Sequence, residues 1–154
     1  MAQHSLLVLA LRMRASPTGL ADTVARRELL HDADEGLLGF DPISPLKPFL
    51  GPGYAALAER LRVAIFSRYA LPNWTREDKK AHKLADRIAA ASEAIHVAGW
   101  TKTEVRRVLG IAEPPAQDDP LAPLHGDAAW EPWPADVAAE RFQAMLGRLS
   151  RDIR

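Results

Sequence analysis

The spacing of the apolar residues restricts the fold of this chain more than any other feature of its sequence. Between residues 54 and 66, apolar side chains recur at steps of three and four, which places them on one face of an α-helix. No segment shows a convincing alternation of apolar and polar residues, which is the pattern of a half-buried strand. The sequence therefore predicts an all-α fold, built as a compact single-domain helical bundle.

Helices are predicted wherever helical spacing continues between turn-forming residues. The first is almost wholly apolar, as is typical of a buried helix, and Asp22 is the expected N-cap of the second. The fourth has a lean, alanine-rich face that permits close packing, and a capping box from Thr101 to Glu104 begins the fifth. The predicted helices cover residues 3–13, 22–37, the stretch before Leu71, residues 75–97 and 101–110, with a last helix after Pro134.

The length of 154 residues suits one domain with a buried core, so residues 1–154 are expected to form a single unit. Residues 113–134 stand apart from the rest, because they contain six prolines, several acidic residues and little periodicity. This composition predicts a proline-rich surface loop, or a partly disordered excursion, ahead of the last helix.

Charge and cysteine content narrow the functional classes. Twenty basic residues balance twenty acidic ones, so the net charge favours neither nucleic acid nor an anionic membrane as a partner. The chain has no cysteine, so a metal would have to be held by His, Asp or Glu. No apolar run approaches the length of a membrane helix, and the apolar stretch 6–11 lacks a basic segment before it. A cytoplasmic protein is the expectation.

The segment 29–35, which reads Leu-Leu-His-Asp-Ala-Asp-Glu, is the most informative part of the chain for chemistry. Neighbouring side chains on a helix are about 100° apart, so His31 and Asp32 would flank a cation that lies off the edge between them. Glu35 lies one turn beyond His31 on the same side. Two ligands cannot hold a catalytic cation alone, and His4 and Asp86 are the candidates in otherwise apolar helical surroundings.

Each of these residues also has an ordinary structural explanation. Asp86 would pair with Lys83 or Arg87 on a solvated edge, His4 would lie in a frayed helix end, and Glu35 would be a surface carboxylate. His82, one turn before Asp86, could be a partner behind the ligands, but a solvated helix position is the favoured interpretation. Spacing alone leaves a metal site as the minority hypothesis.

Several short blocks nevertheless follow one another in a characteristic order, at residues 3–8, 29–35, 43–47, 85–88 and 93–94. An HD dipeptide alone is a weak signal, whereas ordered blocks with these flanks are a strong one. Their order resembles that of the HD-domain superfamily of metal-dependent phosphohydrolases. The similarity is closest to the bacterial 5′-deoxynucleotidase-like HD hydrolases, and it spans roughly residues 3–110.

The resemblance implies a helical bundle of the HD-domain type and a set of site residues. It implies one divalent metal ion (Mn, Co, Ni, Mg, Fe or Zn), activated water, and a (deoxy)nucleoside 5′-monophosphate as the substrate. It also implies a homodimer. The implied metal ligands are His4, His31, Asp32 and Asp86, the implied catalytic residue is Glu35, and the substrate contacts are Lys47 and Asp41.

Two departures from the family pattern bear on the substrate site. Phe40 separates Gly39 from Asp41, so Asp41 is displaced from its expected position. Relatives also carry an upstream segment that helps to hold the nucleotide, whereas this chain begins almost at its first ligand. Alternative functions are a deoxynucleoside triphosphatase or phosphodiesterase of the same superfamily, and a catalytically impaired metal-binding helical domain.

Overall fold

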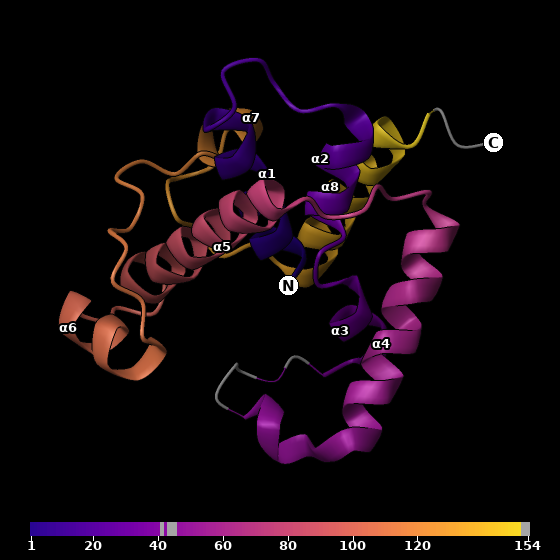
Figure 1. Cartoon of the computed structure of the whole chain (residues 1–154). Helices are drawn as coiled ribbons and strands as arrows, with labels where there is room; N and C mark the ends of the chain where they lie inside the picture. Colours follow the sequence, from indigo (N-terminus) through magenta and orange to yellow (C-terminus); the bar gives the residue numbers. More distant parts are fainter. Residues whose placement is uncertain (41, 43–45, 152–154) are drawn as a thin grey trace.

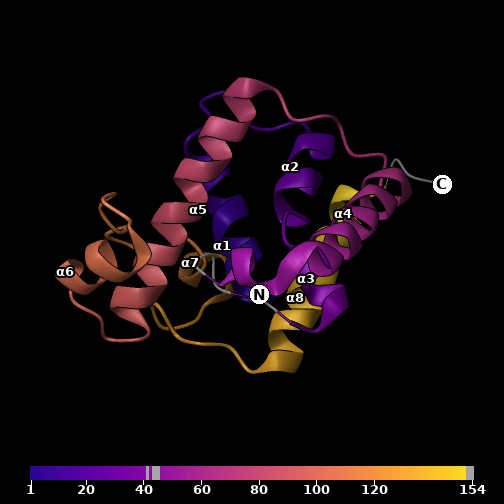
Figure 2. The ribbon, with the colours of Figure 1, turned by 60° about the horizontal axis from the view of Figure 1, so that its bottom comes forward.

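In the computed structural model, which describes residues 1–40, 42 and 46–151, all regular secondary structure is helical (Figures 1 and 2). The all-α prediction is confirmed. The helices, in chain order, are α1 (Ala2–Arg14), α2 (Asp22–Leu29), α3 (Ala33–Leu38), the 3-10 turn η1 (Lys47–Leu50), α4 (Gly51–Arg68), α5 (Arg76–His96), α6 (Lys102–Glu104), the π turn η2 (Val105–Leu109), α7 (Ala122–His125) and α8 (Ala135–Leu149).

Helix α1 forms the centre of the core, in contact with α2, α5 and α8 (Figure 1). Its apolar residues 6–9 are all buried, which confirms the prediction of a buried first helix. On α5 the facing residues are Ala85 and Ala89, and because alanine has a small side chain the two helices can approach closely. Leu29 of α2 and Leu149 of α8 complete this main core.

The predicted helix 22–37 is interrupted, and this corrects the sequence-based prediction. Asp22 is the first residue of α2 rather than its cap, which is Ala21, and α2 ends at Leu29. The amide of Ala33 bonds the carbonyl of Leu30 at 3.2 Å, which closes a tight turn, and α3 then begins. His and Asp have low helix propensity, so a break costs little there. His31 and Asp32 consequently lie in the junction between the two helices.

The region after α5 is held by the predicted capping box. The Thr101 side chain accepts a bond from the Glu104 amide, while the Glu104 carboxylate accepts one from the Thr101 amide. Only one α-helical turn follows, because residues 105–109 adopt the wider π form before Gly110 ends the segment at a φ of +67°. π turns are frequent at functional sites, and this one lines a cavity described below.

Residues 113–134 pack more closely than a surface loop would. Asp119, Pro120 and Leu121 are buried, and the Asp119 carboxylate accepts bonds from the amides of Leu121 (2.8 Å) and Trp130 (2.7 Å). Trp130 and Trp133 lie against the main core. The proline-rich segment therefore covers the core between α1 and α8.

Helix α4 lies at the edge of the fold, where its main neighbours are α3 and η1 (Figure 2). Ile65 is its one buried residue, and Leu57, which the apolar spacing placed on the inner face, is exposed. None of the helices in the described part of the chain combines the length and apolar character needed to cross a bilayer.

Replacing Leu29 with alanine tests the main core. The Leu29 side chain is fully buried, so Leu29→Ala is expected to lower the free energy of unfolding by about 2–5 kcal/mol through lost burial and a residual cavity. Denaturant unfolding followed by circular dichroism measures the change. Leu124→Ala, at a residue that is 65% exposed, is the matched control and should shift stability by at most about 0.5 kcal/mol. Equal effects of the two changes would contradict this assignment of the core.

Candidate metal centre

Three elements that are distant in sequence meet around one cluster of imidazoles and carboxylates. His4 comes from the first turn of α1, His31 from the α2–α3 junction and Asp86 from the middle of α5. Each offers one ligand atom, and these atoms all lie within 4.8 Å of one another. A single cation placed among them would be within reach of all three side chains.

His4 lies between two carboxylates of α5. Its Nδ1 is 2.7 Å from Glu93 Oε2, and its Nε2 is 3.1 Å from Asp86 Oδ1. Burial by itself would lower the pKa of His4, but the bonds to Asp86 and Glu93 outweigh it and raise the pKa to about 10. His4 is therefore an imidazolium at neutral pH, and its positive charge balances the carboxylates in the metal-free protein.

His31 is oriented by the backbone of the preceding helix, α2. Its Nδ1 donates a hydrogen bond to the carbonyl oxygen of Glu28 at 2.8 Å, which turns Nε2 toward the cluster. Nε2 lies 3.0 Å from Asp32 Oδ2, yet this buried nitrogen has no well-aligned hydrogen bond within the described structure. Burial opposes protonation, but the contact with Asp32 outweighs it and raises the pKa of His31.

Asp32 and Asp86 are the anionic partners of the two imidazoles. Burial would raise the pKa of each carboxyl, but His31 beside Asp32 and His4 beside Asp86 outweigh it, so both pKa values are lowered. Both residues therefore stay ionised near neutral pH. Asp32 lies outside the tight group of three ligand atoms but faces the same cavity.

Glu35 and Lys47, the predicted catalytic residue and substrate contact, pair with each other. Lys47 Nζ donates to Glu35 Oε1 at 2.6 Å, and this bond joins α3 to the start of η1. Burial would lower the pKa of Lys47, but Glu35 outweighs it and raises that pKa. Asp41, the other predicted substrate contact, lies outside the described residues.

A cavity of about 710 Å³ lies beside the cluster, and His4, Asp86 and Asp32 line it. Its charged walls combine carboxylates with three cationic side chains, those of Lys47, Lys83 and Arg87. Arg87 is anchored by bonds to the Gly110 carbonyl (2.9 Å) and Glu113 Oε2 (3.1 Å). Leu109 and Ile111, at the end of the π turn, form an apolar side of the cavity. The cavity thus offers positive groups, apolar surface and the candidate ligands together.

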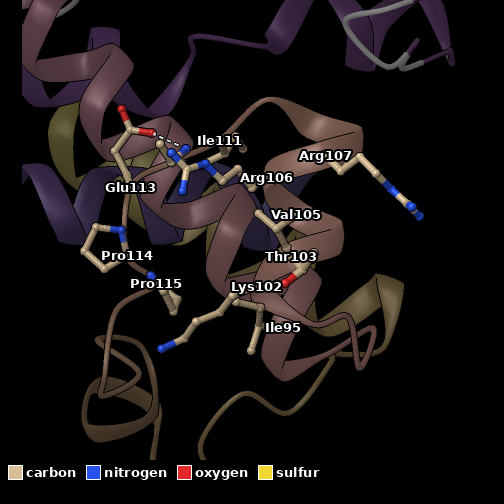
Figure 3. A pocket seen from close by; sticks show the side chains of 11 residues that line it. Ile95, Lys102, Thr103, Val105, Arg106, Arg107, Ile111, Glu113, Pro114 and Pro115 are labelled. Atoms are coloured by element: carbon tan, nitrogen blue, oxygen red, sulfur yellow. Dashed lines mark hydrogen bonds between the residues drawn. The ribbon is translucent and has the colours of Figure 1, made fainter.

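A second cavity, of about 550 Å³, also borders the π turn (Figure 3). Figure 3 shows Lys102 and Arg106 directed toward the 113–115 side of this cavity, and Arg107 directed away from it. The described residues that line it include no histidine, and its carboxylate, Glu113, is paired with Arg87. The residues that line this second cavity therefore offer no group of metal ligands.

Sequence reasoning missed the residues that support the ligands. The Glu93 carboxylate fixes His4. The backbone carbonyl of Glu28 fixes His31, and the Glu28 carboxylate fixes His82. His82 is therefore a partner behind the ligands rather than a solvated residue. Because Glu28 lies in an ordinary amphipathic stretch, the only available signal was its position one turn before His31.

The comparisons with known proteins identify a relative but no function. No family model matches this chain. Over 114 residues the chain is 41% identical to an uncharacterized protein of Rhodobacter capsulatus, and this alignment covers 73% of the chain and 57% of the relative. The chain thus spans little more than half the length of that relative. The similarity assigns no activity to either protein.

The unusual pKa of His4 makes the stability of the metal-free protein depend on pH. Since the folded pKa is about 10 and the ordinary value is 6.5, the stabilisation is fully present below pH 6.5 and is lost as the pH rises through about 10. His4→Gln should remove this dependence. Thermal unfolding with a chelator present should show the melting temperatures of the two proteins converging between pH 6.5 and pH 10. A constant difference over that range would contradict the assigned His4 charge.

Proposed function

We propose that this protein is a metal-dependent phosphohydrolase of the HD superfamily that acts on a nucleotide phosphate ester in the cytoplasm. The substrate class is a (deoxy)nucleoside 5′-monophosphate. The observation that supports this proposal most directly is that His4, His31 and Asp86 offer ligand atoms within 4.8 Å of one another. Asp32 and Glu35 line the cavity that His4 and Asp86 also line. The spacing of these residues along the sequence does not by itself bring them together.

The donor set suits a divalent metal ion. Two imidazoles and neighbouring carboxylates supply nitrogen and oxygen ligands, which several transition metals accept. His31 Nε2 is buried without a hydrogen bond of good geometry, and a metal ion would satisfy it. The Nδ1 atoms of His4 and His31 are already held by Glu93 and by the Glu28 carbonyl, as is typical of histidines whose other nitrogen binds a metal.

Glu35 is the residue that would handle the proton of the attacking water. Bound in this cavity, a divalent cation supplies positive charge that favours loss of a proton from water and counters the charge growing on the phosphate. Glu35 lines the cavity and accepts a hydrogen bond from Lys47. The Glu35 carboxylate accepts the proton of the water when Lys47 shares or releases it. Lys47 then carries a positive charge beside the phosphate.

The remaining cations suit the phosphate group. Lys83 and Arg87 lie on α5 on either side of Asp86 in sequence, and both line the cavity. Arg87 is immobilised by Gly110 and Glu113, whereas Lys83 has no hydrogen bond or ion pair to the described residues. An anionic phosphate would enter a cavity whose cationic groups lie close to the carboxylates that hold the metal.

Metal content and phosphate release test the proposal together. The purified protein is expected to hold a divalent metal and to release phosphate from nucleoside 5′-monophosphates with added manganese, cobalt, nickel or magnesium. His31→Ala should lose both metal and activity, because it removes a ligand. Glu35→Gln should keep the metal and lower kcat by about 10²–10⁴-fold, because it removes the proton acceptor.

His125→Ala is the control, since His125 is a histidine outside the cluster, packed against Trp133. It should leave both metal content and phosphate release unchanged. Nucleoside triphosphates and cyclic nucleotides in the same panel distinguish the triphosphatase and phosphodiesterase alternatives. Absence of bound metal and of phosphate release in the folded protein would refute the proposal.

A further inference from the structure

A carboxylate with no solvent exposure lies directly behind the candidate metal centre. Glu28 of α2 is 0% exposed, and its Oε1 accepts a bond from Arg12 Nε at 3.2 Å. Its Oε2 lies 2.7 Å from His82 Nδ1. Its backbone carbonyl accepts the bond from His31 Nδ1. One residue therefore fixes one nitrogen of each of two neighbouring imidazoles.

The His82 ring contacts two other rings. It meets His31 edge to face, with 4.8 Å between ring centroids, and it contacts Trp74, also at 4.8 Å. The guanidinium of Arg27 covers Trp74 at 3.9 Å from the ring centroid. Arg27, Trp74, His82 and His31 thus form one column that ends at a candidate ligand.

Stability alone gives a poor account of this column. Burying the Glu28 carboxyl group together with the Arg12 and Arg27 side chains costs desolvation free energy that their mutual attraction only partly offsets, and apolar replacements are often no less stable. The charged groups instead fix the orientation of neighbouring side chains. They hold Glu28 in one orientation, and Glu28 together with Trp74 holds His82 in one orientation against His31.

We propose that His82 is a positioning residue for the metal centre, acting through its edge contact on His31 and its bond to Glu28. This inference rests on the metal centre of the proposed function. The Glu28 carbonyl fixes His31 Nδ1 but leaves the ring free to tilt about that bond, and the His82 ring limits the tilt. His31 Nε2 then faces His4 and Asp86 before a cation arrives, so less free energy is spent on ordering the ligand.

Cobalt binding measures this role directly, because the visible absorption of protein-bound Co²⁺ reports ligand geometry. Metal-free wild type, His82→Ala and His82→Phe would be titrated with Co²⁺. His82→Ala is expected to bind Co²⁺ about 10–100-fold more weakly and with an altered spectrum. His82→Phe, which keeps the ring but cannot donate to Glu28, should fall between wild type and His82→Ala.

The matched control is His96→Ala. His96 lies on the same helix and also stacks on a tryptophan, Trp130, at 4.4 Å, but it has no contact with the cluster. Its loss should leave the Co²⁺ affinity and spectrum at the wild-type values. Circular dichroism verifies that each variant is folded, and if His82→Ala does not fold, His82→Phe decides the question.

Each other result has a defined consequence. Wild-type affinity and spectrum in a folded His82 variant would mean that the column only packs, and would overturn the inference while leaving the metal centre intact. Complete loss of binding in both His82 variants would make His82 a ligand and would also overturn it. Failure of wild-type protein to bind Co²⁺ would overturn the proposed metal centre and this inference together.

Discussion

The close contact between α1 and α5 is the constraint on which the candidate site depends. Ala85 and Ala89 are buried at this contact, and their small side chains let the two helices approach. His4 on α1 then reaches Asp86 and Glu93, which lie more than eighty residues away in sequence. Bulkier residues on this face would separate the helices and with them the imidazole from both carboxylates.

Charge compensation is a second feature of the structure. The cluster around His4 and the column behind His31 both bring charged groups together, and in both the charges have partners of opposite sign. The imidazolium of His4 supplies positive charge beside Asp86 and Glu93. A metal ion that bound at this cluster would displace the His4 proton, as is general for sites built from histidine.

Sequence reasoning named four candidate ligands, of which His4, His31 and Asp86 lie close together, but it misjudged the local structure that presents His31 and Asp32. It placed His31 and Asp32 within one continuous helix, whereas they occupy the break between α2 and α3. A break of this kind depends on the balance between modest helix propensities and tertiary contacts, and propensities alone do not resolve it. Glu28 escaped notice, Glu93 was given no role and His82 was expected in solvent, because their roles arise from contacts across helices.

The sequence by itself determined the helical class, the buried first helix, the lean face of α5 and the capping box at Thr101, since each depends on residues close together in the chain. Only the tertiary structure decided which side chains meet. His4 pairs with Asp86 and Glu93, Lys47 pairs with Glu35, and His82 packs on His31 because packed helices bring distant residues to one place. Helical periodicity sets the direction of a side chain on its own helix, whereas its partner depends on how the helices pack.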